Sequence, residues 1–484
     1  MRRPFRVGSH LDVTRAQTPY TPGPMFRVAI LLALLASPQG PEDEARAALD
    51  RAEKLARSSK FSDAKAAYER LAKKSPETDA GKIAARRATP SAYLGWDWVV
   101  EHGPSSNRVD IVLMGDGYEM EHLKGFTKLA ADIPPLFERQ ATFREYWNYL
   151  NFLRCDLLSA DSGVDGFGRE YDTALNASTG ATFAGHVVID RARVLAMFAE
   201  MPGHDNLAIC FVKNGVLGTG GGGIATIGGR EATTTVHEWG HAFGQLGDEY
   251  ETAQSASHGA AGRAANVSDT EDPQKVPWVH WLEAKHPGVG VYEGAAARAR
   301  GAWRPTTTGC TMASGERFCI VCQEALVLRI YAYVDPIDTC SPDPQPIRAQ
   351  PALELGEAGL TFDVQVMRPT SHALDVTWWI LPEARFPSTG AGSTPGGRAK
   401  AGLRDRSRRG ALIPITDEPL QPARGEMDGQ HQLKLAAKDL EPGKYLVVCR
   451  AKDSTKLRGE KWPWVLKDEN GVLESERAWW IVVK

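Results

Sequence analysis

The segment from Thr233 to Tyr250, TTTVHEWGHAFGQLGDEY, constrains the fold of this 484-residue chain more than any other stretch. His237, Glu238 and His241 form the pattern H-E-x-x-H. Because an α-helix turns once in 3.6 residues, the two histidines lie on one face and can bind the same ion. Glu238 lies about 100° further round the helix, where a general base can take a proton from metal-bound water. The pattern predicts a zinc-binding helix with a catalytic glutamate.

A zinc ion bound by two histidines needs a third protein ligand. Asp248 lies about 10 Å beyond the second histidine if the helix continues, so the helix must end between them. Gly244 and Gly247 accept positive φ and can supply a turn back toward the metal. Asp248 is therefore the expected third ligand, with Glu249 and Glu324 as alternatives. The competing interpretation, an amphipathic helix whose histidines only form hydrogen bonds, leaves the two glycines unexplained.

The chain has seven cysteines, a number that suits an oxidising compartment without making a disulfide-dense scaffold. Cys310, Cys319, Cys322 and Cys340 are close together in the sequence, and the middle two form C-x-x-C. A second zinc site would need another close pair, so the spacing favours structural disulfides among these four residues. Their connectivity stays open.

The N-terminal region carries a pattern typical of exported proteins. Arg27 precedes the apolar run Val28 to Ala36, and small residues follow it, which predicts a signal peptide at 25–38. Residues 1–24 are then an upstream mis-start. The apolar run is too short to cross a bilayer, and no other stretch suggests a membrane span. We therefore expect a secreted or periplasmic protein.

Three regions of different texture follow. Residues 41–90 have apolar positions at helical spacing with a break at 60–62, which predicts a helical hairpin similar to one tetratricopeptide unit. Residues 91–345 alternate candidate strands and helices, as in a layered α/β domain. A proline-rich linker at 335–351 leads to residues 351–484, whose short alternating apolar runs predict an immunoglobulin-like β-sandwich.

Charge excludes one class of partner. The formal net charge is −3 and the sequence contains no long basic block, so nothing supports binding to nucleic acid. The oligomeric state is not indicated by the sequence.

The segment HEWGHAFGQLGDEY resembles the active-site segment of the bacterial immunoglobulin A peptidase family of zinc metallopeptidases, in which H-E-x-x-H-x-x-G/A is followed by D-E-Y. The resemblance covers about 105–335 and includes RVDIVLMGDGY, SADSGVDGFG and NVSDTEDPQKVPWVHW. It implies that His237, His241 and Asp248 are zinc ligands and that Glu238 is the general base. The family looks metzincin-like, which would make Met312 in CTMASG the methionine of the turn beneath the metal. By its chemistry alone, Met312 is equally a core residue.

The expected fold is an α/β zincin-like (metzincin-like) catalytic domain with a small N-terminal helical segment and a C-terminal all-β sandwich. The expected function is that of a secreted zinc-dependent endopeptidase acting on a protein or peptide substrate. The alternative is a non-catalytic, zinc-scaffolded binding protein that uses the sandwich to hold a cell-surface protein or polysaccharide. Zinc hydrolysis of a non-peptide amide is a further alternative.

Overall fold

The computed structural model describes residues 40–484, except for 167, 180–185, 202–204, 230–231, 253–263, 308, 345–351, 386–411, 424–428 and 458–459. The expected signal peptide at 25–38 and the upstream residues 1–24 lie outside the described residues, as does the segment 386–410 of the expected β-sandwich, which the sequence predicts to be an exposed loop because it is rich in glycine and arginine.

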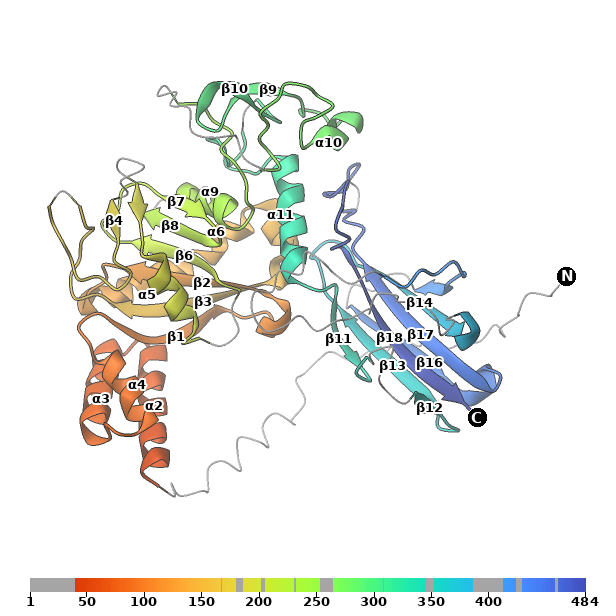
Figure 1. The fold of residues 1–484 in the computed structure, drawn as a ribbon, viewed down its shortest axis with the longest axis horizontal. Coiled ribbons are helices and arrows are strands. Elements are labelled where there is room, and N and C mark those ends of the chain that lie inside the picture. Colours follow the sequence, from red (N-terminus) through yellow and green to blue (C-terminus); the bar gives the residue numbers. More distant parts are fainter. Residues whose placement is uncertain are drawn as a thin grey trace.

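A six-stranded sheet forms the centre of the molecule, with the strand order β1-β3-β2-β6-β8-β7 (Figure 1). Strands β2, β3, β6 and β8 are parallel to one another, whereas the edge strands β1 and β7 are antiparallel to their neighbours. The strands are β1 Ala92–Val100, β2 Val109–Asp116, β3 Leu150–Leu158, β6 Leu207–Val212, β7 Thr219–Gly221 and β8 Ile224–Gly228. Two short strands, β4 Ser178–Thr179 and β5 Val187–Val188, pair separately.

Alternation along the central strands gives the sheet two apolar faces. On β2, Ile111 and Leu113 join one hydrophobic cluster, while Val112 and Met114 join another on the opposite side. Helices cover both faces, which makes this part of the chain a mixed α/β structure. These helices are α5 Leu123–Asp132, α6 Pro134–Glu138, α7 Ala141–Glu145, α8 Arg191–Phe198, α9 Ala232–Ala242 and α11 Ile320–Tyr333.

A small lobe lies above the end of α11 (Figure 1). It contains α10 Val279–Glu283 and the hairpin of β9 Tyr292–Ala295 with β10 Arg298–Arg304. The residues between α9 and α11 thus contain a defined hairpin, although the sequence between these helices reads mostly as loop.

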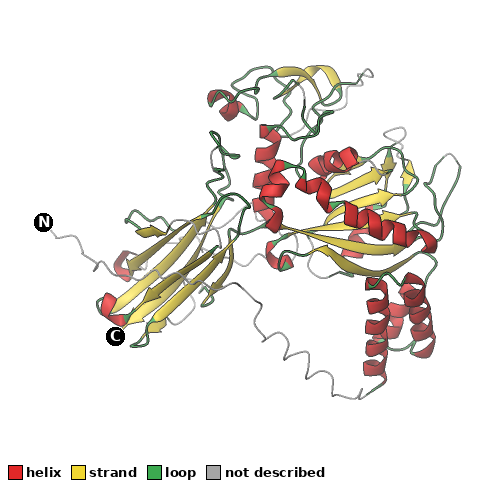
Figure 2. Ribbon diagram, turned by 180° about the vertical axis from the view of Figure 1, so that it is seen from behind, coloured by secondary structure: helices red, strands yellow, loops and turns green. Residues whose placement is uncertain are grey.

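Three helices precede the sheet: α2 Pro41–Arg57, α3 Phe61–Lys74 and α4 Asp79–Arg87. They lie at one end of the sheet, away from the C-terminal strands, in both views (Figures 1 and 2). Buried Tyr68 fixes this contact, because its hydroxyl donates a hydrogen bond of 2.7 Å to the carbonyl of Leu94 on β1. Helix α4 adds a third helix beyond the expected hairpin.

The C-terminal residues form two sheets with the orders β11-β13-β16 and β12-β18-β17-β14-β15. Both sheets contribute to one hydrophobic cluster, in which the rings of Phe362 and Trp479 lie 5.1 Å apart. The strands are β11 Ile337–Ser341, β12 Leu353–Leu355, β13 Leu360–Val366, β14 Asp375–Pro382, β15 Leu420–Ala423, β16 Gln430–Leu435, β17 Gly443–Lys452 and β18 Glu474–Val483. Strand β11 falls in the segment expected to be a linker, because its pairing with β13 outweighs the prolines that flank it.

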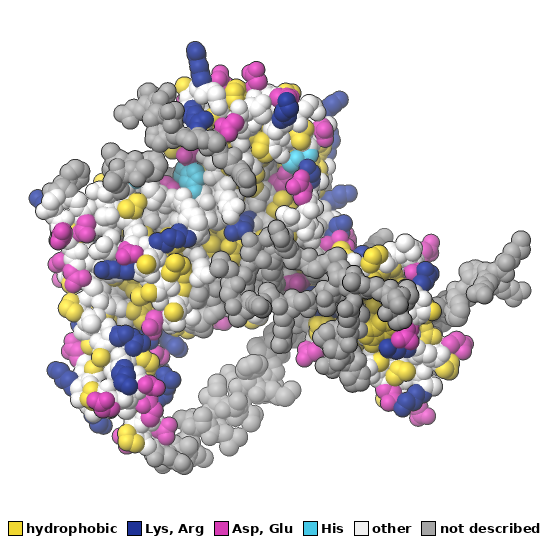
Figure 3. Space-filling view, in the orientation of Figure 1, with side chains coloured by type: hydrophobic (Ala, Val, Ile, Leu, Met, Phe, Trp, Pro, Cys, Tyr) yellow, Lys and Arg dark blue, Asp and Glu magenta, His cyan; other side chains and the backbone are white. Residues whose placement is uncertain are grey.

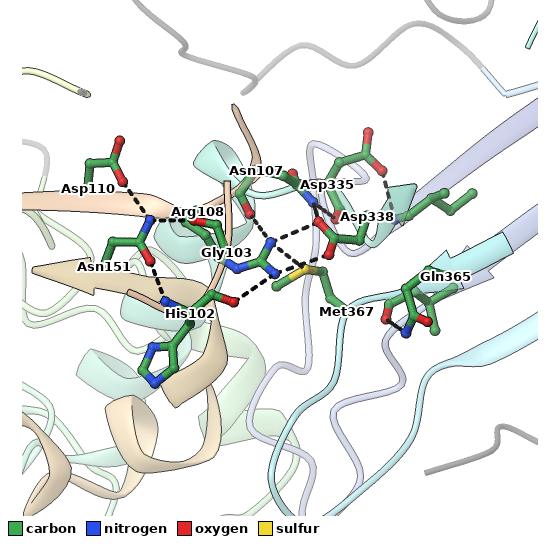
Figure 4. Close-up of polar contacts among 12 residues, drawn as sticks. His102, Gly103, Asn107, Arg108, Asp110, Asn151, Asp335, Asp338, Gln365 and Met367 are labelled. Atoms are coloured by element: carbon green, nitrogen blue, oxygen red, sulfur yellow. Dashed lines mark hydrogen bonds and ion pairs between the residues drawn. The ribbon is translucent and has the colours of Figure 1, made fainter. Parts of the chain in front are cut away.

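A buried ion pair joins the six-stranded sheet to the C-terminal strands (Figure 4). The guanidinium of Arg108, just before β2, donates to both carboxylate oxygens of Asp338 on β11, at 2.8 and 3.1 Å. Asn107 donates to Asp338 at 2.9 Å and receives a 2.7 Å hydrogen bond from the backbone of Asp335. These bidentate contacts fix the two parts against each other.

Within the described residues, no helix combines the length and apolar composition that a bilayer crossing requires.

Candidate metal centre

Helix α9 carries the histidines and packs against the glycine-rich edge strand β7. A Cβ atom on Gly220 would lie 2.3 Å from the carbonyl oxygen of Glu238 and 2.9 Å from Cβ of His241. A Cβ atom on Gly218 would lie 2.9 Å from Cγ of Glu238. Gly218 and Gly220 are therefore the residues of GTGGGG that let this segment lie directly on the helix.

Three ligand-type atoms converge beside this helix. The Nε2 atoms of His237 and His241 are 3.1 Å apart, and Oδ1 of Asp248 lies 3.2 and 3.1 Å from them. A tetrahedral ion about 2.0–2.1 Å from its ligands would separate these atoms by about 3.3 Å. The triangle therefore has the size that one zinc-like ion requires, and these side chains form a group that can hold a metal ion.

The hydrogen bonds of the two rings leave these atoms facing one another as acceptors. His237 Nδ1 donates to the carbonyl of Thr311 at 2.9 Å, and His241 Nδ1 donates to the carbonyl of Leu246 at 2.7 Å. In the neutral rings each Nε2 then carries a lone pair. Oδ1 of Asp248 is buried and has no hydrogen-bond partner among the described residues. When both rings are neutral, a cation placed between these atoms would relieve the repulsion of their lone pairs, so the donor set fits a metal.

The turn after α9 differs from the expectation in one respect. The residue with a left-handed backbone is Gln245, with φ of 54°, and neither Gly244 nor Gly247 has positive φ. The two glycines are needed for space instead. A Cβ atom would lie 2.8 Å from the carbonyl oxygen of Gly240 at the first position and 2.7 Å from Val267 at the second.

Burial and the interaction with Asp248 determine the pKa values of the two histidines. Burial lowers the pKa of His237 and of His241, but the Asp248 carboxylate outweighs it, so the pKa of each imidazole is raised. Burial likewise favours neutral Asp248, yet the two imidazoles hold the pKa of its carboxyl well below the usual range. Without a metal, the three side chains form a mutually stabilised charged cluster.

Glu238 lies on the same helix, buried with 8% of its surface exposed. Burial raises the pKa of its carboxyl, and the charges of His241 and His237 offset only part of that effect. A buried carboxylate with a raised pKa is a stronger base than an exposed one, which suits proton transfer.

Tyr250 stands next to His237, with ring centroids 6.1 Å apart. Burial, followed by the charge of Asp248, raises the pKa of its hydroxyl. The phenol therefore remains protonated, and its hydroxyl forms a hydrogen bond with the Asp248 carboxylate.

Met312 is fully buried beneath the helix. A Cβ atom on Gly240 would lie only 2.4 Å from the Met312 sulfur, so the missing side chain between the histidines makes room for the thioether. The residue before it, Thr311, provides the carbonyl that orients His237. Met312 thus packs against α9 at Gly240, the position between the two histidines in the sequence.

The alternative ligands lie elsewhere. Oε1 of Glu249 points to Cys322, 3.0 Å from its sulfur. Glu324 Oε2 accepts hydrogen bonds from the side chains of His280 and Trp281, at 2.5 and 2.7 Å. Its Oε1 accepts a hydrogen bond of 2.7 Å from the backbone N–H of Leu466. Glu324 therefore links α11 to α10 and to the segment around Leu466.

The cysteines correct the expectation of disulfides. All seven are free thiols, each of them among the described residues. Cys310, Cys319 and Cys322 surround Glu249, whereas Cys340 lies on β11 outside this group. Two features of the sequence belong to this cluster: the C-x-x-C pattern and Glu249, the acid that follows Asp248. Nothing in the sequence indicates that Glu249 lies beside the thiols.

The site opens to the surface of the molecule. Histidine side chains are visible between the lobe that carries β9 and β10 and the part that carries the six-stranded sheet (Figure 3). His237 and Asp248 keep 16% and 25% of their side-chain surface exposed. The side chains of His237 and Asp248 are therefore partly accessible from outside, although Oδ1 of Asp248 is buried.

Comparison with known proteins adds an independent observation. Residues 98–288 match the model of a family described as IgA Peptidase M64. This confirms the resemblance found in the sequence. The matched segment includes both histidines, Glu238 and Asp248, and it ends before Met312 and the clustered cysteines. A comparison with curated proteins found no match.

Proposed function

Since residues 98–288 belong to the IgA peptidase M64 family, we propose that this chain is a secreted, zinc-dependent endopeptidase. The observation that carries the proposal is the triangle of His237 Nε2, His241 Nε2 and Asp248 Oδ1, whose edges measure 3.1–3.2 Å. Imidazole and carboxylate groups at this spacing are the ligands of catalytic zinc sites, which leave a fourth position open.

The residues of the chain have distinct roles in this proposal. A zinc ion held by the three ligands would act as a Lewis acid and lower the pKa of a bound water. Glu238 accepts the proton of the attacking water and later passes it to the leaving amine. The protonated hydroxyl of Tyr250 donates a hydrogen bond to the Asp248 carboxylate and so orients this ligand.

The edge strand β7 positions the substrate. It ends the sheet, and its pairing partner among the described strands is β8. Extended peptides bind free strand edges through backbone hydrogen bonds, with alternate side chains giving specificity. A substrate paired with β7 would lie across the helix that carries Glu238, because Gly218 and Gly220 bring the strand onto that helix.

The scaffold assigned in this proposal is metzincin-like. Four parallel strands, an antiparallel edge strand next to the helix that carries the histidines, and Met312 packed against Gly240 of that helix support it. The C-terminal strands, whose two sheets share one core, are proposed as an immunoglobulin-like sandwich. The proposed domains are 41–90, 91–345 and 351–484. Strand β11 precedes the last domain in the sequence but pairs with its strand β13. Export rests on the pattern at 25–38.

The proposal is tested by profiling a peptide library with the zinc-loaded full chain. We expect cleavage that a chelator abolishes and that added zinc restores. Adhesion of the zinc-loaded chain to cell-wall material, with no cleavage of any peptide, would overturn the proposal and favour the binding-protein alternative.

A further inference from the structure

A second group of ligand-type side chains lies directly behind the histidine site. Oε1 of Glu249 is 3.3 Å from the sulfur of Cys310, 3.5 Å from that of Cys319 and 3.0 Å from that of Cys322. The sulfurs of Cys310 and Cys322 are 3.8 Å apart. One ligand atom from each residue lies within 4.8 Å of all the others.

These distances match tetrahedral coordination. A zinc ion about 2.3 Å from thiolate sulfur would separate two sulfurs by about 3.8 Å. With its oxygen ligand at about 2.0–2.2 Å, the sulfur and oxygen would lie about 3.5 Å apart. The separation of the Cys310 and Cys322 sulfurs equals the first value, and the three sulfur–oxygen separations of 3.0–3.5 Å lie at or just below the second. A disulfide would require sulfurs about 2.05 Å apart.

Burial makes the group unusual without a cation. Glu249, Cys310 and Cys322 are each at most 1% exposed. A buried carboxylate is costly unless it is paired or coordinates a metal. No Lys, Arg or His side chain forms an ion pair with Glu249 among the described residues. Besides the three thiols, two neutral donors reach it: the amide of Asn266 at 2.9 Å and the hydroxyl of Thr306 at 3.3 Å.

The surrounding backbone favours thiolates. Cys319 is the N-cap residue of α11, and Cys322 lies in the first turn of this 14-residue helix, where the helix dipole favours negative charge. The backbone N–H groups of Met312 and Cys319 both point at the Cys310 sulfur, at 3.4 Å each. These donors orient and stabilise a metal-bound sulfur, as outer contacts do in metal sites.

We propose that Glu249, Cys310, Cys319 and Cys322 bind a second zinc ion, which is structural and closed to substrate. Binding would release the protons of the coordinating thiols to solvent. The ion ties the loop after α9 to the turn at Thr311 and to the start of α11. The loop also carries Asp248, and the turn also carries the carbonyl that orients His237, so the two sites share these segments while each binds its own ion. This inference goes beyond the proposed peptidase activity.

The test counts metal and reads its ligands in the full chain, purified with reductant. We expect two zinc ions per chain by elemental analysis. Replacement of zinc by cobalt(II) should give intense thiolate-to-metal charge-transfer absorption, because only the second site contains sulfur. The His237→Ala variant should lose one ion and keep this absorption.

The Cys319→Ser variant should lose the absorption and one ion, whereas the control Cys340→Ser, a half-buried cysteine outside the group, should keep both. If Cys319→Ser fails to fold, the metal count and cobalt spectrum of the unmodified chain still decide the question. One ion per chain with no charge-transfer band, or a disulfide among the three cysteines in mass spectrometry, would overturn the proposal. Two ions in a chain without peptidase activity would contradict the proposed function and leave the second site standing.

Discussion

Asp248 and Glu249 are consecutive in the chain, yet the carboxylate of Asp248 lies beside the histidines and that of Glu249 lies beside the cysteines. Oδ1 of Asp248 is 3.1 Å from His241 Nε2, while Oε1 of Glu249 is 3.0 Å from the sulfur of Cys322. The backbone N–H of Glu249 also donates a 2.7 Å hydrogen bond to the carbonyl of Met312. A displacement of this loop would therefore disturb both groups together.

Replacing Asp248 by Asn should weaken metal binding at the histidine site. Asn keeps the shape but removes the negative charge, and even outer contacts of metal sites contribute about 10–100-fold to affinity. We expect a loss of at least about 100-fold in zinc affinity, measured by competition with a chromophoric chelator. The neighbouring variant Glu249→Gln should leave the thiol-free site with most of its affinity, and equal losses in both variants would contradict these assignments.

Replacing Gly220 by Ala should impair activity. The added Cβ would lie 2.3 Å from a backbone oxygen of α9, so the strand or the helix must move. Displacement of catalytic groups by about 1 Å can cost about 100-fold, which is the expected drop in kcat/KM for a cleaved peptide. The control is Gly221→Ala, because a Cβ at that exposed position meets nothing within 4 Å. Similar activity of the two variants would show that the close approach is unimportant.

The ion pair of Arg108 and Asp338 should stabilise the joint between the sheet and the C-terminal strands. Arg108→Met leaves a carboxylate in a site where the pair is only 7% and 14% exposed. Loss of one partner of a buried pair costs about 3–5 kcal/mol of the free energy of unfolding, measurable in urea. The exposed pair of Lys128 and Asp132 is the comparison, and Lys128→Met should cost less than about 1 kcal/mol. Equal effects would contradict the role of the joint.

Stability should fall at alkaline pH through His372. Its Nδ1 lies 2.8 Å from Glu145 Oε1 and its Nε2 lies 2.7 Å from Asp453 Oδ1. Burial lowers the pKa of this imidazole, but the two carboxylates outweigh it and raise the pKa to about 9. The charged form is therefore favoured by folding. Its contribution is fully present below about pH 6.5 and is lost as the pH rises through about 9.

The size of this effect is up to about 3 kcal/mol, since each pKa unit corresponds to about 1.4 kcal/mol. The free energy of unfolding should be measured in urea at pH 6.5 and 9.5 for the unmodified chain and for His372→Gln. We expect the variant to lose most of the difference between the two pH values. The same pH dependence in both proteins would rule His372 out as its source.

The sequence predicted the elements that are marked by periodicity. The alternation in LTFDVQV and the spacing of His237 and His241 each identify one element, because both depend on residues close together in the chain. Strand β11 was not predicted, because its five residues are flanked by prolines and form a strand only through pairing with β13, which lies further along the chain.

The candidate site was predictable where its ligand-type side chains lie on one helix and the turn after it. Its supports were not, because Thr311 and Leu246 act through backbone carbonyls, which any residue type provides. The separation of Glu249 from Asp248 likewise depends on which way a side chain leaves the loop. Spacing alone therefore left both acids as candidates for one ion.

The most direct test of the account compares peptide hydrolysis by the zinc-loaded chain and by its Glu238→Gln variant, with zinc content measured in the same samples. The variant keeps the size of the side chain and removes the base. We predict that it retains the same zinc and cleaves the preferred library peptide about 100–10,000-fold more slowly. Equal rates in two samples with equal zinc would contradict the proposed mechanism.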